Sequence, residues 1–194
     1  MDDAAKAPMQ ITIPTALTLF RIALLPVMVV VFYAGFRGAN IAAAAIFMAA
    51  ALTDWLDGWV ARRYDMGSAF GAFLDPVADK LMVAVTLFLL VQENPTPLMA
   101  VTSAVIVGRE ISISALREWM AEIGERAKVG VATVGKVKTV MQIIAIVVLL
   151  YQHDLESLRP FYIGETLLVF AAVLTIWSGI QYVRAAWPIL KQQR

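Results

Sequence analysis

Long runs of apolar residues are the feature that most restricts what this chain can fold into. A helical run of about 20 apolar residues is long enough to cross the hydrocarbon core of a bilayer, which is roughly 30 Å thick. The runs cover residues 15–36, 40–63, 68–91, 97–118, 133–152 and 160–183. Hydrophobic residues make up 60% of the 194 residues, whereas a soluble domain is nearer half apolar. The sequence therefore predicts an all-α integral membrane protein with six transmembrane helices.

The connectors between these runs are short and polar, and the chain has no internal repeat. We therefore expect a single membrane domain over residues 1–194, with residues 1–14 as a short cytoplasmic segment. Lysine and arginine concentrate on the cytoplasmic side of membrane proteins. With the N-terminus inside, the inner side holds Lys6, Arg62, Arg63, Arg117, Arg126, Lys128, Lys136, Lys138, Arg184, Lys191 and Arg194. The outer connectors hold only Arg37 and Arg159, so both termini are expected to be cytoplasmic.

Four aspartates interrupt the second and third runs near their expected cytoplasmic ends: Asp54, Asp57, Asp75 and Asp79. An aspartate at the centre of a membrane helix costs about 2.5–3.5 kcal/mol on insertion scales, so it needs a partner or a polar cavity. Spacings of three and four residues place each pair on one helix face. Because the connector between the two runs is short, we expect antiparallel neighbouring helices. Their carboxylates would then face one another across a polar cavity open to the cytoplasm.

A divalent cation, or two, would relieve the repulsion among four such carboxylates. The chain has no cysteine, and its one histidine, His153, lies in a polar connector. Oxygen ligands without histidine or cysteine favour Mg²⁺ or Mn²⁺ over zinc. Gly58 and Gly71 remove side chains beside the carboxylates, and Arg62 lies one helical turn beyond Gly58. Metal ions, small residues and an arginine together indicate a site for a diphosphate.

The spacing of these residues is that of a known signature. Reading from Asp54 to Asp79, the chain matches D-x2-D-G-x2-A-R-x8-G-x3-D-x3-D without a gap. This pattern resembles the signature of the CDP-alcohol phosphotransferase family of integral membrane enzymes. The resemblance implies that Asp54, Asp57 and Asp75 hold the metals, two ions per site, and that Asp79 lies near a metal and acts as general base. It also implies that Gly58, Ala61, Arg62 and Gly71 bind the CDP-diacylglycerol donor.

The resemblance extends over nearly the whole chain. The segments IPTALTLFRIALLPV, FGAFLDPVADK and VGREISISALREWMAE are similar to those of a bacterial subfamily, the phosphatidylglycerophosphate synthases. Many of these have asparagine where this chain has Thr15, and Thr15 and Arg21 are weaker candidates for contacts with donor or acceptor. The subfamily implies transfer of a phosphatidyl group to sn-glycerol 3-phosphate with release of CMP. It also implies a homodimer in the bacterial inner (cytoplasmic) membrane, and nothing indicates a nucleic-acid partner.

Cationic residues at the inner helix ends are candidates for binding the phosphate of the acceptor. The candidates are Arg109, Lys136, Arg117 and Lys138. Arg109 is the most informative, because it follows an apolar run. An arginine inside a membrane costs free energy unless it has an anionic partner or binds a ligand. Simple anchoring of the inner side explains Arg126 and Lys128 better. Glu110 is expected to be ion-paired or solvated rather than to take part in catalysis.

Three other interpretations of the sequence remain open. A sister enzyme could use the same donor with another alcohol: serine or phosphatidylglycerol would leave the basic residues unexplained, but inositol phosphate would not. A cation transporter could line its path with aspartates, although such proteins often have inverted repeats and broken helices. A purely structural membrane scaffold is the third alternative, and it explains the fewest of these sequence features.

Overall fold

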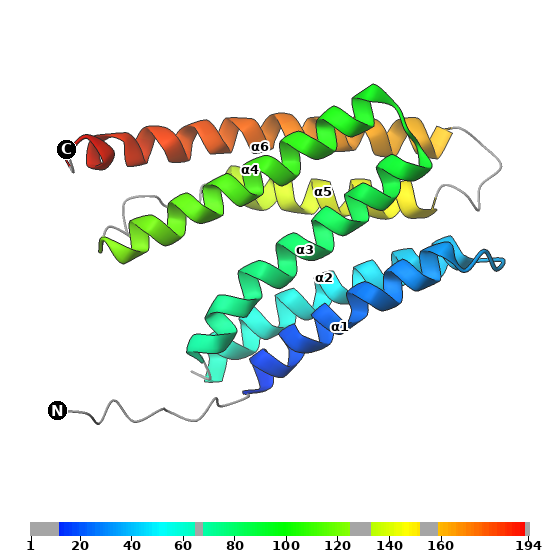
Figure 1. Ribbon diagram of the computed structural model, residues 1–194, viewed down its shortest axis with the longest axis horizontal. Coiled ribbons are helices and arrows are strands. Elements are labelled where there is room, and N and C mark those ends of the chain that lie inside the picture. Colours follow the sequence, from blue (N-terminus) through cyan, green and yellow to red (C-terminus); the bar gives the residue numbers. More distant parts are fainter. Residues whose placement is uncertain (1–11, 65–67, 125–132, 152–158, 193–194) are drawn as a thin grey trace.

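The described residues of the chain form six helices (Figure 1). The computed structural model describes residues 12–64, 68–124, 133–151 and 159–192. The elements in these ranges are α1 (Ile13–Tyr33), α2 (Ala39–Tyr64), α3 (Ala69–Glu93), α4 (Pro97–Glu122), α5 (Thr133–Tyr151) and α6 (Arg159–Gln192). Every regular element of the described part is a helix. The prediction of an all-α fold with six helices is therefore confirmed.

Local sequence explains several helix ends. Thr12 and Thr96 each cap a helix N-terminus with a side-chain oxygen, and each is followed by a proline in the first turn, where the missing amide hydrogen costs nothing. Gly35 and Gly38 have φ angles of 63° and 88°, which allow the tight turn between α1 and α2. These helix ends are therefore determined by residues close to them in sequence.

Two helices are longer than the apolar runs predicted. Helix α4 continues to Glu122, so the expected connector over residues 119–132 is wrong for its first four residues. Helix α6 continues to Gln192, nine residues beyond the predicted end at residue 183. Both extensions are polar or mixed in sequence and pack on each other: Met120 of α4 is buried with Ala186 and Ile189 of α6. This tertiary packing, which an apolar run does not reveal, extends the helices.

Within the described residues, four helices are long and apolar enough to cross a membrane: α1, α2, α4 and α6. Helix α3 carries Asp75, Asp79 and Lys80 toward one end and Glu93 at the other, which lowers its apolar character. The apolar part of α5 spans only Val137–Tyr151. Large apolar side chains are exposed on all six helices, among them Phe20, Leu52, Phe88, Val101, Val140 and Phe170. An apolar surface on every helix is what a lipid environment requires, so the chain is a multi-pass membrane protein.

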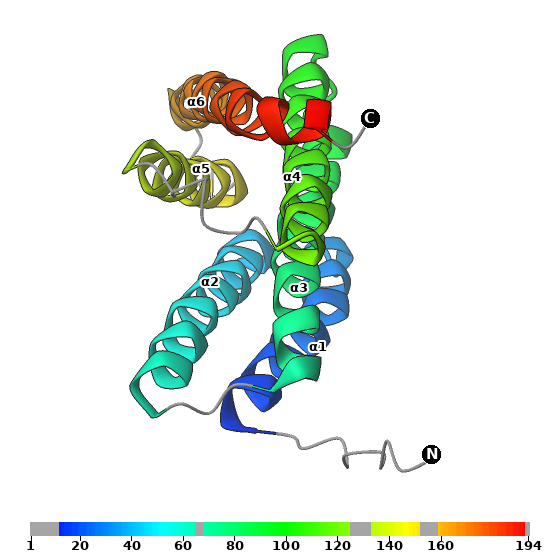
Figure 2. The same cartoon turned by 90° about the vertical axis from the view of Figure 1, so that its left-hand side faces the viewer.

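The helices form two groups, which are joined by the packing of α3 on α4 and of α2 on α5 (Figures 1 and 2). Helix α1 packs against both α2 and α3, whereas α5 packs on α6 and α4 links α3 to α6. The direct contact between α2 and α3 is slight, so the expectation that they are close neighbours is only partly right: α1 mediates their packing. One apolar core takes buried side chains from every helix, including Met28, Phe47, Leu87, Ile106, Leu149 and Leu168.

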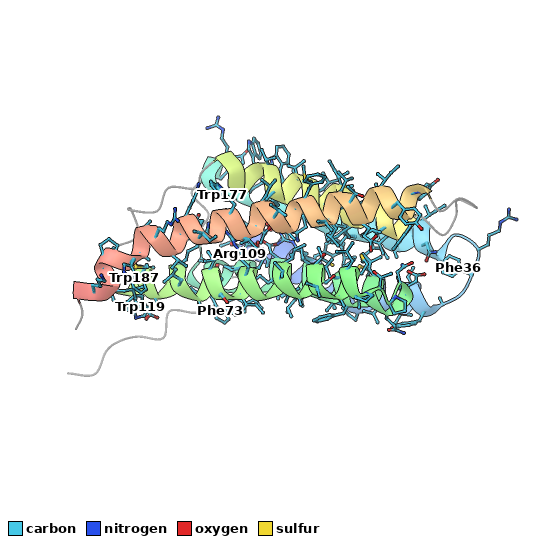
Figure 3. The ribbon with its side chains drawn as sticks, turned by 90° about the horizontal axis from the view of Figure 1, so that it is seen from above. Phe36, Phe73, Arg109, Trp119, Trp177 and Trp187 are labelled. Atoms are coloured by element: carbon cyan, nitrogen blue, oxygen red, sulfur yellow. The ribbon has the colours of Figure 1, made fainter. Side chains whose placement is uncertain are left out.

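The ends that carry the polar residues lie on one side of the bundle. The start of α1, the end of α2, the start of α3 and the ends of α4 and α6 lie at the left of Figure 1. Trp119 and Trp187 are at this end as well, whereas Trp177 lies nearer the middle of α6 (Figure 3). The bundle therefore has one polar end and a largely apolar body.

Candidate active site

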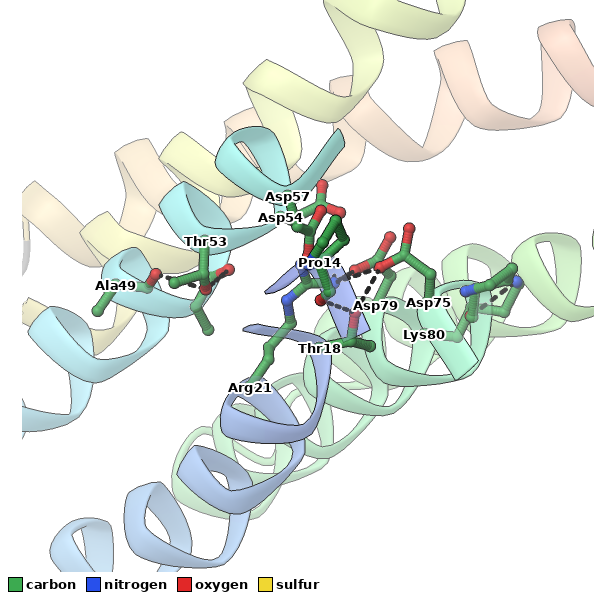
Figure 4. A network of polar contacts seen from close by, with 12 residues as sticks. Pro14, Thr18, Arg21, Ala49, Thr53, Asp54, Asp57, Asp75, Asp79 and Lys80 are labelled. Carbon is green, nitrogen blue, oxygen red and sulfur yellow. Dashed lines mark hydrogen bonds and ion pairs between the residues drawn. The ribbon is translucent and has the colours of Figure 1, made fainter. Parts of the chain in front are cut away.

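The four aspartates of α2 and α3 come together at the polar end of the bundle (Figure 4). Carboxylate oxygens of Asp54, Asp57 and Asp75 all lie within 4.8 Å of one another. Asp79, one turn farther along α3, shares a partner with all three. The prediction that the two pairs face each other is therefore confirmed; we call these four residues the acidic cluster.

The shared partner is Arg21 of α1, whose guanidinium lies between the two pairs (Figure 4). Its Nη2 donates a hydrogen bond of 2.5 Å to Asp57 Oδ2, and its Nη1 lies 3.3 Å from Asp54 Oδ1 and 3.4 Å from Asp75 Oδ1. Nη1 also donates to Asp79. Arg21 is 1% exposed, and Asp57 is the one aspartate of the four that is equally buried, at 2%. The Arg21–Asp57 pair is therefore the buried centre of the cluster.

The contacts of Arg21 with the four aspartates were not predicted from the sequence, in which Arg21 was only a candidate for contacts with donor or acceptor. It is surrounded in sequence by the apolar residues of α1, and a buried arginine in a membrane helix needs anionic partners. The same argument singled out Arg109 and would have singled out Arg21. What the sequence does not show is that α1 passes between α2 and α3, and this packing brings Arg21 to the aspartates.

Small polar residues fix how closely α1 approaches α3. The Thr15 hydroxyl lies 2.8 Å from that of Ser68, and Thr18 donates a hydrogen bond of 3.3 Å to Asp75. A Cβ atom added at Gly71 would lie 2.7 Å from Thr15 Oγ1, a distance that real Cβ atoms essentially never show. Gly71 is therefore needed for helix packing beside Asp75, whereas its contact with a donor nucleotide stays a prediction.

The remaining signature residues lie on the last turns of α2. Gly58 is half-buried and directly follows Asp57. Ala61 and Arg62 belong to the helix, but their side chains lie outside the described part of the structure. Their predicted contacts with the donor therefore stay predictions.

The acidic cluster has the composition of a site for a hard divalent cation. Its donors are all carboxylate oxygens, which Mg²⁺ and Mn²⁺ prefer. Asp57 Oδ1 is buried and has no hydrogen-bond partner within the described residues, and a buried polar atom without a partner is costly. The residues present therefore fit a divalent ion, which would compete with the Arg21 guanidinium for the same oxygens.

A second polar cluster lies between α4, α5 and α6. Arg109 donates a hydrogen bond of 2.7 Å to the Ser178 hydroxyl and lies 3.3 Å from Glu110 Oε1. Lys138, which is 7% exposed, donates to the same oxygen of Glu110. Glu110 is thus ion-paired, as predicted. A Cβ atom added at Gly179 would lie 3.2 Å from Arg109 Nε, so the glycine leaves room for this side chain.

Tyr182 of α6 joins a third cation to this cluster. Arg117 donates a hydrogen bond of 2.5 Å to the Tyr182 hydroxyl. The guanidinium carbons of Arg117 and Arg109 lie 4.8 and 5.8 Å from the centre of the tyrosine ring, within the range of cation–π contacts. Three of the four predicted phosphate-binding residues are therefore brought together, and we call Arg109, Arg117 and Lys138 the basic cluster. The side chain of Lys136 lies outside the described part.

A cavity of about 490 Å³ lies between α3, α4 and α5 and connects the surroundings of the two clusters. Asp79 of the acidic cluster and Glu110, the partner of Arg109 and Lys138, both line it. Its volume is within the range of about 300–1,000 Å³ typical of small-molecule sites. A ligand in this cavity could touch Asp79 while its far end approaches the basic cluster.

Fold and site together define a multi-pass, all-helical membrane protein with an oxygen-rich centre suited to a divalent cation. Comparison with known proteins identifies the family within this class: the family model of CDP-alcohol phosphatidyltransferases matches residues 11–177. The chain belongs to the CDP-alcohol phosphatidyltransferase family.

Curated relatives match the chain along nearly its whole length. It is 49% identical over 178 residues to the CDP-diacylglycerol–glycerol-3-phosphate 3-phosphatidyltransferase of Salmonella choleraesuis (strain SC-B67), covering 92% of this chain and 96% of that protein. It is 48% identical over 185 residues to the proteins of the same name from Escherichia coli (strain K12) and Shigella flexneri serotype 5b, covering 95% of this chain and all of theirs. The expected family resemblance is confirmed.

Proposed function

We propose that this protein transfers the phosphatidyl group of CDP-diacylglycerol to sn-glycerol 3-phosphate, giving phosphatidylglycerophosphate and CMP. The observation that carries the proposal is the cavity that runs from Asp79 of the acidic cluster to Glu110 at the edge of the basic cluster. A phosphorylated alcohol needs both features: a carboxylate at its hydroxyl and cations at its phosphate. The names of the curated relatives support the same reaction.

Asp54, Asp57 and Asp75 would hold one or two divalent ions, Mg²⁺ or Mn²⁺, at the position where Arg21 now meets them. Bound there, the metal would supply positive charge to the diphosphate of the donor and to the oxygens between which the phosphoryl group moves. Gly58, Ala61 and Arg62, on the last turns of α2, are proposed to contact that diphosphate. Because the site lies near one end of the helices, the lipid tails of the donor can stay in the bilayer.

Asp79 is proposed as the general base. Its carboxylate lines the cavity, so it can take the proton of the acceptor 1-hydroxyl when that hydroxyl enters. The hydroxyl oxygen then forms a bond to the β-phosphorus of CDP-diacylglycerol, and the bond from that phosphorus to the oxygen of CMP breaks. Arg109, Arg117 and Lys138 are proposed to hold the acceptor phosphate during the transfer.

The acceptor is the part of this proposal that a direct assay tests best. Purified protein in detergent with CDP-diacylglycerol and Mg²⁺ would be offered glycerol 3-phosphate, inositol phosphate, serine or no acceptor, and CMP release measured. We expect release with glycerol 3-phosphate alone. Release with inositol phosphate instead would keep the reaction type but replace the acceptor, and no release with any acceptor would favour the transport interpretation, which ion flux in liposomes without CDP-lipid would test.

We further propose one membrane domain with both termini on the cytoplasmic side of the bacterial inner membrane. The support is the excess of lysine and arginine at the polar end of the helices. Because the chain contains no cysteine, single-cysteine variants can map this topology. In intact spheroplasts, an impermeant maleimide should label Arg37→Cys and not Lys191→Cys; the reverse pattern would overturn the orientation. The homodimer implied by the family resemblance is also a proposal, which cross-linking in native membranes tests.

A further inference from the structure

The α3–α4–α5 cavity contains a polar side chain that the proposed reaction does not yet use. Gln142 of α5 lines the cavity and is only 6% exposed. Its amide atoms are not among the fully buried side-chain atoms without a hydrogen-bond partner, so the amide can be reached from the cavity that it lines. A ligand that displaces water from this amide must replace the hydrogen bonds of that water, because otherwise binding costs free energy. Gln142 therefore favours a ligand with hydrogen-bonding groups in this cavity.

The other walls of the cavity narrow down the chemistry of that ligand. Apolar side chains such as Val83, Val107 and Ile111 form much of the lining, and Ser114 of α4 adds a hydroxyl. Four charged residues line the cavity as well, with carboxylates from Asp79, Glu110 and Glu118 and one amine from Lys80, so negative charge predominates. A small neutral polyol segment fits such walls better than an anion, whose charge these carboxylates would repel.

The acceptor named under the proposed function has such a segment, on which this inference rests. Glycerol 3-phosphate carries one hydroxyl that reacts, a phosphate, and a second hydroxyl on the carbon between them. With the reacting hydroxyl at Asp79 and the phosphate toward the basic cluster, this middle hydroxyl must lie inside the cavity. It then needs a partner there.

We propose that the side-chain amide of Gln142 hydrogen-bonds the 2-hydroxyl of the acceptor and so makes the enzyme specific for a vicinal diol phosphate. An amide offers both a donor and an acceptor, so it can satisfy a hydroxyl in either direction. Gln142 would act on specificity and not on the chemical step itself. An acceptor without the 2-hydroxyl would leave the buried amide unpaired, and a site built around a hydroxyl discriminates strongly against the analogue that lacks it.

The test compares glycerol 3-phosphate with 3-hydroxypropyl phosphate, which keeps the reacting hydroxyl and the phosphate but lacks the 2-hydroxyl. For the unaltered protein we expect kcat/KM to be about 10- to 100-fold lower with the analogue, the usual effect of one unpaired buried polar group. In Gln142→Met, which keeps the length of the side chain without its amide, the two acceptors should be used within about twofold of each other. The control Gln181→Met changes an exposed glutamine of α6 and should keep the discrimination of the unaltered protein.

The possible outcomes separate this inference from the proposed function. If the unaltered protein uses both acceptors equally well, or if Gln142→Met discriminates as strongly as the unaltered protein, the role of Gln142 is overturned while the reaction stands. If the unaltered protein does not use glycerol 3-phosphate at all, the proposed function fails and this inference fails with it. Should Gln142→Met not fold, Gln142→Leu, which also lacks the amide, provides the same comparison of the two acceptors.

Discussion

Replacing Arg21 with glutamine should destabilise the metal-free protein, and a divalent cation should restore much of that loss. In the described structure the Arg21 guanidinium is the cation that all four aspartates of α2 and α3 contact. Glutamine keeps part of the side chain and its hydrogen-bonding ability but removes the charge. The carboxylates would then lie together without this partner.

The size of the effect follows from burial. Both side chains of the Arg21–Asp57 pair are 2% exposed, whereas those of Asp54, Asp75 and Asp79 are 45%, 39% and 42% exposed. Exposed ion pairs contribute about 0–1 kcal/mol each. Breaking a buried pair costs about 3–5 kcal/mol, because one charge is left uncompensated. The Asp57 pair therefore dominates, and a loss of this size lowers Tm by roughly 6–20 °C for a chain of this length.

Thermal unfolding in detergent measures this loss, first with EDTA and then with Mn²⁺ or Mg²⁺. Because the ion and the guanidinium compete for the same oxygens, we expect the cation to raise the Tm of Arg21→Gln more than that of the unaltered protein. The control Arg37→Gln, at an exposed arginine between α1 and α2, should change the stability by no more than about 0.5 kcal/mol. The reasoning is refuted if Arg21→Gln is as stable as this control in EDTA and gains nothing more from the cation.

Three further substitutions test other parts of the account. Asp79→Asn should reduce kcat by about 10²- to 10⁴-fold, the usual contribution of a general base, with little loss of CDP-diacylglycerol binding; turnover like that of the unaltered protein would exclude Asp79 as the base. Gly71→Ala should destabilise the protein by about 1–3 kcal/mol through overpacking between α1 and α3, whereas Gly108→Ala, where a Cβ meets nothing within 4 Å, should be neutral or stabilising; equal Tm values would contradict this. Tyr182→Phe removes the hydrogen bond that Arg117 donates and should raise KM for glycerol 3-phosphate about three- to tenfold with a smaller effect on kcat; an unchanged KM would show that Tyr182 does not position the basic cluster.

Much of the acidic cluster could be predicted from the sequence, because its geometry is local. Spacings of three and four residues place Asp54 with Asp57 and Asp75 with Asp79 on helix faces, whatever the rest of the fold does. The short connector between α2 and α3 then limits how far apart the pairs can lie. The number of helices was equally accessible, since each crossing needs its own apolar run.

The parts that the sequence did not reveal depend on packing between distant helices. Nothing local places α1 between α2 and α3, so the contact of Arg21 with the four aspartates and the closeness of Gly71 to Thr15 came only with the structure. The same holds for Tyr182, which lies far along the chain from the two arginines it contacts. The long end of α6 was missed because its last turns pack on α4 and are not uniformly apolar.

The most direct test of the central claim follows radiolabelled glycerol 3-phosphate into lipid. Purified protein in mixed micelles with CDP-diacylglycerol and Mg²⁺ should transfer the label to a chloroform-extractable phospholipid, with one CMP released per label transferred. Omission of CDP-diacylglycerol, addition of EDTA, or the substitution Asp57→Asn should each abolish the transfer. Label that stays in the aqueous phase under the complete conditions, or lipid labelling that persists in EDTA, would contradict the account of a metal-dependent phosphatidyl transfer at the acidic cluster.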